Sequence, residues 1–263
     1  MSNTVLLCAP IHFDVIYSIN PWMVGEPVNS AVALEQWFRL KDTLEEWGVS
    51  VKLIGQVGNL PDMVFTANAG TVRGNKVVLS NFRFPERQPE TDVYESWFKE
   101  EGYETYRLPK KYNFEGCGDT VISGDKMYAG YGVRSDLGGI RRAAKILDLE
   151  LIPLKLSHNS FYHLDTCFCL LNNQCAMYYP GAFTPSALKK LRKHIPDLIP
   201  LDVHDAAHFA ANSVVYQENR VLMPAGPQKI VEELDIRGVE VTHINTSEFL
   251  KSGGSLQCMT LWI

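Results

Sequence analysis

The sequence predicts an α/β fold in which five similar units, each a β-hairpin followed by a helix, close into a five-fold pseudosymmetric ring. Three observations support this fold class. A hairpin pattern recurs at a nearly constant spacing, amphipathic segments lie between the hairpins, and apolar segments near both ends of the chain can pair with each other.

The hairpin pattern begins with Asn or Asp, passes through an apolar run, turns at a short polar pair and continues through a second apolar run. Four copies start at Asn68, Asp119, Asp165 and Asn212. Successive starts lie 51, 46 and 47 residues apart, and one further step of 46 residues reaches Cys258. We therefore expect a fifth hairpin that a cysteine opens.

The fifth hairpin has only its first strand, MTLWI, at the end of the sequence. The apolar segment at residues 4–10, TVLLCAP, is predicted to supply the return strand, so that the termini pair in the last repeat. This pairing closes the array, and the five opening residues then meet around one polar pocket. The alternative is an ordinary open sheet formed by a coincidental run of α/β units.

Five segments between the hairpins carry apolar residues at i, i+3 and i+4 spacing, which is typical of amphipathic helices. They cover residues 30–48, 90–103, 138–149, 184–195 and 228–238. Together with the hairpins they make up the five units. We expect residues 1–263 to form a single domain.

The composition is that of an ordinary globular chain, with 46% apolar and 21% charged residues. The net charge is −5 and no basic run or stripe is present, which argues against nucleic acid or an anionic membrane as partner. No apolar stretch approaches the ~20 residues that span a bilayer, and the N-terminus lacks the basic start of a secretory signal. We expect a cytoplasmic protein with a small-molecule partner.

The six cysteines lack the density of a disulfide scaffold. A two-residue turn at Asn172 and Asn173 would place Cys175 opposite Leu170, on the other face of the hairpin from Cys169, which disfavours a local disulfide. A zinc site is the alternative to small buried side chains, but paired CxxC spacing is missing from its four possible ligands, Cys117, Cys167, Cys169 and Cys175. We therefore predict no metal.

The predicted pocket brings a thiol together with acids. Carboxylates around Cys258 would raise the pKa of its thiol unless a cation shares the pocket, so a positively charged substrate fits this site. His163 lies two residues before Asp165 and would share its face on a strand, and Glu115 lies four residues before Asp119. These groups suit nucleophilic attack on an electrophilic, cationic carbon, with acid help for a departing amine.

Each of these features has a structural alternative. Taken alone, a His-x-Asp pair or a cysteine near a chain end more often belongs to the protein core than to an active site. Their placement at corresponding positions of the repeat favours the functional interpretation.

Seven segments, in family order, resemble the guanidine-modifying enzymes of the pentein fold, an α/β propeller. This group includes arginine deiminases, dimethylargininases, amidinotransferases and cyanobacterial-type arginine dihydrolases. The resemblance covers nearly the whole chain. It rests on HFDVIYSINPWM at 12–23, PDMVFTANAG at 61–70, ERQPET at 86–91, FEGCGD at 114–119, GYGVRSD at 130–136, HLDT at 163–166 and GGSLQCMT at 253–260.

The resemblance implies a cofactor-free reaction at a cysteine. Cys258 would attack the guanidinium carbon and form a covalent thiouronium-type adduct. His163 would protonate the leaving nitrogen and then activate water. Glu115 and Asp165 would bind guanidinium nitrogens, and Asp119 would orient His163 or support Glu115.

The resemblance also implies binding groups for the amino-acid end of the substrate. Arg87 and Arg134 match arginines that hold the α-carboxylate in relatives. Asn20 and Asp62 are further candidates for this end or for the pocket wall. Without the motifs, Arg87, Arg134 and Asp62 would each be interpreted as solvated surface residues.

One residue differs from the deiminases and favours one of the reactions found in this family. Deiminases carry an aspartate where this chain has Asn68, and arginine dihydrolases share this asparagine and the INPWM segment. A neutral amide can hydrogen-bond a ureido oxygen as well as a cation, so a citrulline-like intermediate can be hydrolysed again. We therefore predict an arginine dihydrolase that forms ornithine, carbon dioxide and two ammonia.

Several alternatives stay open. Dimethylargininases commonly lack the aspartate of HLDT, so Asp165 favours unsubstituted arginine over methylated arginine. The best-known dihydrolases carry a second, C-terminal domain that this sequence does not contain. A deiminase, a dimethylargininase, an amidinotransferase and a non-enzymatic arginine-binding protein are the other interpretations, and a homodimer is possible.

Overall fold

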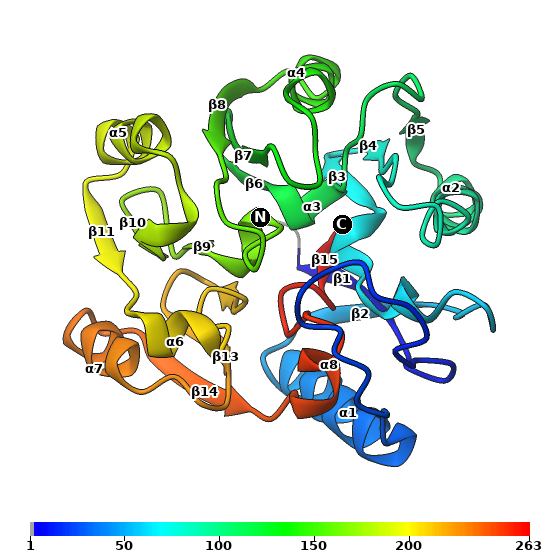
Figure 1. Cartoon of the computed structure of the whole chain (residues 1–263), viewed down its shortest axis with the longest axis horizontal. Coiled ribbons are helices and arrows are strands. Elements are labelled where there is room, and N and C mark those ends of the chain that lie inside the picture. Colours follow the sequence, from blue (N-terminus) through cyan, green and yellow to red (C-terminus); the bar gives the residue numbers. More distant parts are fainter. Residues whose placement is uncertain (1–2) are drawn as a thin grey trace.

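Five three-stranded sheets form the framework of the protein in a computed structural model that describes residues 3–263. In each sheet a central strand pairs antiparallel with one neighbour and parallel with the other. Figure 1 shows the five sheets and their helices arranged around a common centre. This arrangement confirms the predicted α/β class and the five repeating units.

Four sheets contain the predicted hairpins, each followed by a helix and a parallel third strand. In chain order their strands are β3 (Gly70–Arg73), β4 (Lys76–Leu79) and β5 (Glu104–Tyr106); β6 (Thr120–Ser123), β7 (Lys126–Tyr131) and β8 (Glu150–Lys155); β9 (Phe168–Leu170), β10 (Cys175–Tyr178) and β11 (Asp197–Pro200); β12 (Val214–Tyr216), β13 (Arg220–Pro224) and β14 (Glu240–Ile244).

The fifth sheet joins the two ends of the chain. Its strands are β15 (Leu261–Trp262), β1 (Thr4–Cys8) and β2 (Ser50–Ile54). β1 pairs antiparallel with β15, with Val5 opposite Trp262, and parallel with β2. The predicted pairing of the terminal segments is therefore confirmed, and Figure 1 shows β1 and β15 side by side near the centre of the molecule.

All five predicted helical segments are helical, although the helices end earlier than predicted. Glycines with positive φ follow three of them, Gly48, Gly102 and Gly238, and such residues end a helix because they adopt the left-handed conformation without strain. The helices are α1 (Ser30–Glu46), α2 (Glu90–Glu100), α4 (Leu137–Ile146), α5 (Pro185–His194) and α7 (Lys229–Ile236).

Short helical turns precede the hairpins and carry residues that open the repeats. Asn68 lies in η2, Asp119 in α3 and Asp165 in η3, and all three are buried. The short helices are η1 (Pro61–Val64), η2 (Thr66–Ala69), α3 (Gly116–Asp119), η3 (Leu164–Thr166), η4 (Pro180–Ala182), α6 (Val203–Ala207) and α8 (Ser247–Leu250).

The predicted register of one hairpin is wrong by one residue. Ala176, and not Cys175, lies opposite Leu170, so Cys175 shares a face with Cys169. The cause is the turn, because the Asn172 side chain accepts hydrogen bonds from the backbone N–H groups of Gln174 and Cys175 and lengthens it. All six cysteines are nevertheless free thiols.

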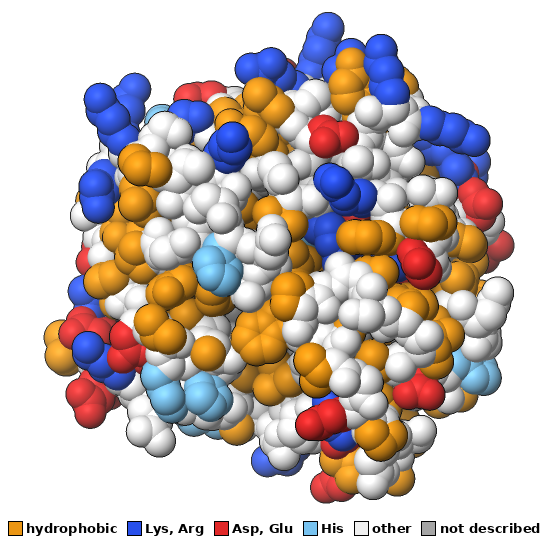
Figure 2. All heavy atoms as spheres, in the orientation of Figure 1, with side chains coloured by type: hydrophobic (Ala, Val, Ile, Leu, Met, Phe, Trp, Pro, Cys, Tyr) orange, Lys and Arg blue, Asp and Glu red, His pale blue; other side chains and the backbone are white. Residues whose placement is uncertain are grey.

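Apolar side chains fill the spaces between sheets and helices, and the largest fully buried ones include Trp37, Tyr94 and Phe98. Figure 2 shows hydrophobic side chains across the middle of one face, with acidic and basic side chains mainly around its rim. Among the helices of residues 3–263, none has the length and apolar character needed to cross a membrane.

Thr66 links the first strand to the segment just before the last strand, near the point of closure. Its Oγ1 lies 2.9 Å from Leu6 O and 2.8 Å from Met259 O, and all three groups are buried. We expect Thr66→Val, which keeps the side-chain shape but removes the donor, to lower the free energy of unfolding by about 1–3 kcal/mol. Urea denaturation followed by circular dichroism measures this change, with Thr242→Val on the partly exposed β14 as control. Equal stability of the two variants would contradict the role of Thr66.

Candidate active site

A small buried pocket lies where the opening residues meet. Its volume of about 10 Å³ is enough for about one water molecule, so an amino-acid substrate requires the pocket wall to move. Residues from several distant segments line it: Ile19, Asn20, Met23, Asp62, Phe65, Asn68, Arg87, Arg134, Tyr162, Ser252 and Cys258. Six of the ten predicted site residues therefore line this pocket. The other four, Glu115, Asp119, His163 and Asp165, are connected to it by the contacts described below.

Cys258 lines the pocket and is buried. Its Sγ donates to Asp165 Oδ2 at 3.1 Å and accepts from Asn212 Nδ2 at 3.1 Å. Burial and the neighbouring Asp165 carboxylate raise the pKa of the Cys258 thiol well above its usual range. The predicted effect of the acids on the thiol is thus confirmed for the free pocket.

Asp165 is the acid nearest to the sulfur. Burial raises the pKa of its carboxyl group to about 7, although the hydrogen bonds from Cys258 and Asn212 oppose this shift. Its Oδ1 is buried and has no hydrogen-bond partner among residues 3–263. This oxygen is free to accept a hydrogen bond from a ligand.

His163 and Asp165 do not share a strand face as predicted. Asp165 lies in the 3-10 turn η3, with His163 just before it, and the two side chains contact different partners. His163 Nε2 lies 2.7 Å from Glu115 Oε2, whereas Asp165 contacts Cys258. The tight turn after His163 breaks the two-residue alternation on which the prediction depended.

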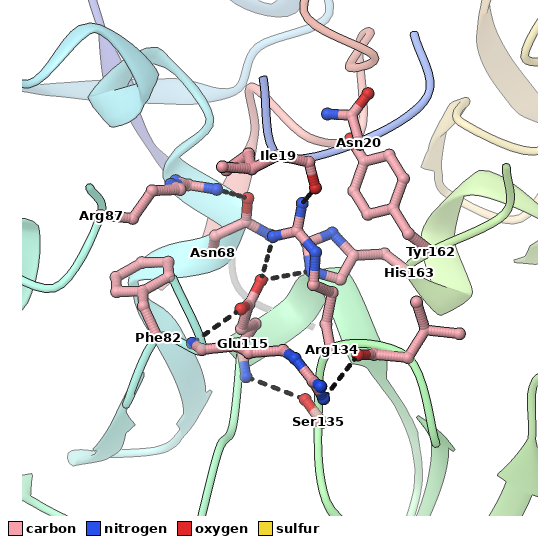
Figure 3. Close-up of polar contacts among 12 residues, drawn as sticks. Ile19, Asn20, Asn68, Phe82, Arg87, Glu115, Arg134, Ser135, Tyr162 and His163 are labelled. Carbon is pink, nitrogen blue, oxygen red and sulfur yellow. Dashed lines mark hydrogen bonds and ion pairs between the residues drawn. The ribbon is translucent and has the colours of Figure 1, made fainter. Parts of the chain in front are cut away.

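Glu115 binds both His163 and Arg134 through a single oxygen. Arg134 Nη1 donates to Glu115 Oε2 at 3.0 Å, and Arg134 Nη2 donates to the carbonyl of Ile19 at 3.0 Å (Figure 3). Burial would raise the pKa of Glu115, but the Arg134 cation and the hydrogen bond with His163 outweigh it and hold this pKa well below its usual range. Glu115 is therefore ionised at neutral pH.

Arg134 occupies a buried position between two aromatic rings. Its guanidinium carbon lies 4.6 Å from the ring centre of Phe84 and 4.7 Å from that of Tyr162. The surface alternative for Arg134 is wrong, since only 3% of the residue is exposed. In this closed arrangement Arg134 pairs with Glu115.

Arg87 orients the amide of Asn68. Two of its nitrogens form a bidentate pair with Glu90 at 2.8 Å each. Its Nη1 donates to Asn68 Oδ1 at 2.7 Å, as Figure 3 shows. Because arginine only donates, the oxygen of the amide must face Arg87 and the Nδ2 group faces away from it. Asn68 Nδ2 is buried and lacks a partner in the described part of the chain.

Asp62 and Asn20 hold the wall of the pocket together. Asp62 accepts from the Tyr17 hydroxyl at 2.9 Å and from Ser252 Oγ at 3.1 Å. Asn20 donates to the carbonyl of Ser252 at 3.0 Å and accepts from the backbone of Trp22. Both are buried, so the surface alternative is wrong for Asp62 and, equally, for Arg87.

Asp119 contacts the neighbours of Glu115 and His163. It accepts from Ser135 Oγ at 2.6 Å and from the backbone N–H of Leu164 at 3.1 Å. Ser135 Oγ in turn accepts from the backbone N–H of Glu115 at 3.0 Å. Asp119 is thus connected to both residues that it was predicted to support, in each case through a neighbour.

Gly118 lets two site residues approach the backbone. A Cβ atom at this position would lie 2.3 Å from Asn68 Nδ2 and 3.0 Å from His163 Nδ1. Both distances are too short for a side chain without displacement of these groups. A glycine is therefore required where α3 passes between Asn68 and His163.

A second cavity of about 330 Å³ lies toward the hairpin turns and is lined mainly by first strands of the repeats. Asp165 and Gln257 also border it. Because the titratable side chains gather around the smaller pocket, we assign the chemistry to that pocket.

One group of possible metal ligands lies outside the pocket. Asp202, His204 and Asp205 bring their ligand atoms within 4.8 Å of one another. The Asp205 carboxylate, however, already accepts hydrogen bonds from the backbone N–H groups of Gln228 and Ile230 and caps the start of α7. This cluster is explained by helix capping.

Sequence reasoning missed three buried neighbours of the site: Glu90, Ser135 and Tyr162. It placed Asn212 at the pocket, as the residue that opens the fourth repeat, but gave it no role. Ser135 lies inside the GYGVRSD motif, and Tyr162 immediately precedes HLDT. The link between Arg87 and Glu90 follows helical i, i+3 spacing and was also visible in ERQPE.

Comparisons with known proteins agree with this geometry. The family profile described as N,N dimethylarginine dimethylhydrolase, eukaryotic, matches residues 20–263. A bifunctional arginine dihydrolase/ornithine cyclodeaminase, ArgZ, from Synechocystis sp. is 41% identical over 98% of this chain, which spans 37% of the length of that relative. An N(G),N(G)-dimethylarginine dimethylaminohydrolase from Mycobacterium tuberculosis is 39% identical to this chain. The match covers 97% of this chain and 83% of the length of that relative.

Among solved structures, the N-terminal domain of ArgZ bound to substrate has a TM-score of 0.95 and 40% identity to this chain. The match covers 98% of this chain and 97% of that domain, which its description calls an arginine dihydrolase from the ornithine-ammonia cycle in cyanobacteria. The similarity thus extends over nearly the whole chain.

The raised pKa of Asp165 predicts a pH-dependent effect on stability. Between its unfolded value of 3.8 and its folded value of about 7, the folded protein keeps a proton that the unfolded chain has released. The contribution of Asp165 to stability therefore falls as the pH rises through this range. We expect Asp165→Asn to raise the melting temperature relative to the parent protein more at about pH 8 than at about pH 5.

Scanning calorimetry at the two pH values measures this difference, with Asp235→Asn on the exposed face of α7 as control. An Asp165→Asn effect that is the same at both pH values would contradict the raised pKa.

Proposed function

Because the chain belongs to the N,N-dimethylarginine dimethylhydrolase family of guanidine-modifying enzymes, we propose that it is a cysteine-dependent arginine dihydrolase. Residues 1–263 would act as one hydrolase domain that converts arginine and two waters to ornithine, carbon dioxide and two ammonia. The dihydrolase activity of a relative with a solved substrate complex supports this assignment.

The orientation of the Asn68 amide is the observation that carries the choice of a dihydrolase. Its oxygen is held by Arg87, so the group left for a ligand is the Nδ2 donor. An N–H donor matches the oxygen of a ureido group, whereas a guanidinium offers only N–H groups of its own. The pocket therefore has a binding group suited to the intermediate of a second hydrolysis.

The first hydrolysis uses the groups around the sulfur. The thiol proton of Cys258 passes to Asp165 Oδ2, 3.1 Å away, and the sulfur bonds to the guanidinium carbon. His163 donates a proton to the departing nitrogen, which leaves as ammonia. Water activated by His163 then attacks the adduct, and the C–S bond breaks to leave a ureido group and the Cys258 thiol.

The second hydrolysis begins with another attack by Cys258, now on the ureido carbon. The oxygen of this group gains negative charge in the attack, and Asn68 Nδ2 is placed to donate to it. The ornithine amine then leaves, and a carbamoyl group remains on the sulfur. Its hydrolysis yields carbon dioxide and the second ammonia. The same sulfur thus serves both steps, and the Asn68 amide acts in the second.

A dimethylargininase is the second candidate, because the matching profile and the mycobacterial relative carry that description. Against it stands Asp165, whose free oxygen near the sulfur suits an unsubstituted guanidinium nitrogen better than a methylated one. A deiminase would stop after one hydrolysis, and an amidinotransferase would use an amine in place of the first water. A homodimer and a cytoplasmic location stay predictions.

Replacement of the nucleophile tests the covalent mechanism. We expect Cys258→Ser to abolish release of ammonia from arginine, since a buried hydroxyl is a far weaker nucleophile than a thiolate, and to leave the fold intact. Ammonia assays and amino-acid analysis measure turnover, and circular dichroism checks the fold. Cys175→Ser, remote from the pocket, is the matched control and should keep the parental rate. Turnover by Cys258→Ser would exclude the proposed mechanism.

Asn68 tests the number of hydrolytic steps. We expect Asn68→Asp to shift the product from ornithine toward citrulline, because the carboxylate pairs with Arg87 and offers no donor to the ureido oxygen. Chromatography of the products from arginine measures the citrulline-to-ornithine ratio, and Asn173→Asp on an exposed turn serves as control. Formation of ornithine and ammonia at the parental rate by Asn68→Asp would remove Asn68 from this role.

A further inference from the structure

Asn212 is fully buried beneath the nucleophile. Its Oδ1 accepts from the backbone N–H of Cys258 at 3.1 Å, and its Nδ2 lies 3.1 Å from Cys258 Sγ and 3.2 Å from the carbonyl of Asp165. In addition, its own carbonyl accepts from the backbone N–H of Gln257 at 3.1 Å. One asparagine thus holds the backbone, the sulfur and the neighbouring acid segment.

The orientation of this amide follows from its partners. The backbone N–H of Cys258 can only donate, so it must face the oxygen of the Asn212 amide. The Nδ2 group is then directed at the sulfur and at the Asp165 carbonyl, both of which can accept. The sulfur therefore has a fixed N–H donor on one side and a carboxylate on the other.

We propose that Asn212 is a catalytic residue that positions the Cys258 sulfur and stabilises its thiolate, both before attack and when the adduct breaks down. The inference rests on the proposed function, in which Cys258 is the nucleophile. Its physical basis is that an N–H donor favours the charged form of an acceptor, and most strongly at a buried site. Asn212 thereby opposes the burial and the adjacent acid, which both favour the neutral thiol.

The residue type is informative. The second and third repeats have Asp119 and Asp165 at the corresponding position, where a carboxylate accepts from N–H and O–H donors or from the Cys258 S–H group. At Asn212 a carboxylate would place a second negative charge beside the sulfur and would lose the donor. An amide is the group that accepts from the Cys258 backbone and also donates to the sulfur.

Alkylation of Cys258 tests this inference without any need for substrate turnover. The purified protein is treated with iodoacetamide from about pH 6 to about pH 10, and the peptide that contains Cys258 is quantified by mass spectrometry. We expect Asn212→Asp to slow alkylation about tenfold or more near pH 8 and to move the midpoint of the rate profile to higher pH. Asn173→Asp, the same change on an exposed turn, should behave as the parent protein.

A second variant separates donor loss from misfolding. Asn212→Ser avoids the added charge and should show a smaller shift in the same direction, with circular dichroism and the melting temperature as checks on the fold. The same alkylation profile in all variants, an unreactive Cys258 in the parent protein at any pH, or loss of the fold in both Asn212 variants would overturn the proposal. Because the assay contains no arginine, a failure of the dihydrolase assignment would appear separately, as absence of ornithine formation by the parent protein.

Discussion

Closure of the ring is achieved by the pairing of β15 with β1. Cys258 lies just before β15, so the antiparallel contact between Val5 and Trp262 also fixes the backbone that carries the sulfur. The hydroxyl of Thr66 and the amide of Asn212 attach the same segment to the first and fourth repeats. The site is therefore a product of ring closure, because its members come from segments that are otherwise far apart in the sequence.

Charge in the closed pocket is divided between two different acids. Glu115 is held ionised by Arg134 and His163, while burial raises the pKa of Asp165 to about 7. Environments that separate the pKa values of two carboxyl groups are typical of sites in which one acid binds charge and the other exchanges a proton. The pKa of the Cys258 thiol is also raised, so the thiol is neutral in the pocket without a ligand. A cation bound beside the sulfur would lower this pKa and favour the thiolate.

The sequence was sufficient for the repeats, the five helices and the joined termini, because each depends on local patterns or on their spacing. It was insufficient where individual side-chain contacts determine the strand register or the direction of a side chain. The extra hydrogen bonds of Asn172 shifted a register, and the tight turn after His163 sent its imidazole toward Glu115. The burial of Arg87 and Arg134 also could not be inferred from composition, because Asn68 and Glu115, which they contact, lie on other segments of the chain.

The buried ion pair between Arg134 and Glu115 limits which ligands can bind in the closed pocket. The Arg134 guanidinium already pairs with Glu115, lies between Phe84 and Tyr162, and donates to the carbonyl of Ile19. An arginine substrate that uses Glu115 as proposed must replace this guanidinium with its own, so one buried ion pair is exchanged for another. Removal of a single partner from a buried pair is costly, whereas exchange leaves neither charge unpaired. Binding is then favoured for a ligand that brings both a guanidinium for Glu115 and a carboxylate for the displaced Arg134, which is the combination that free arginine provides.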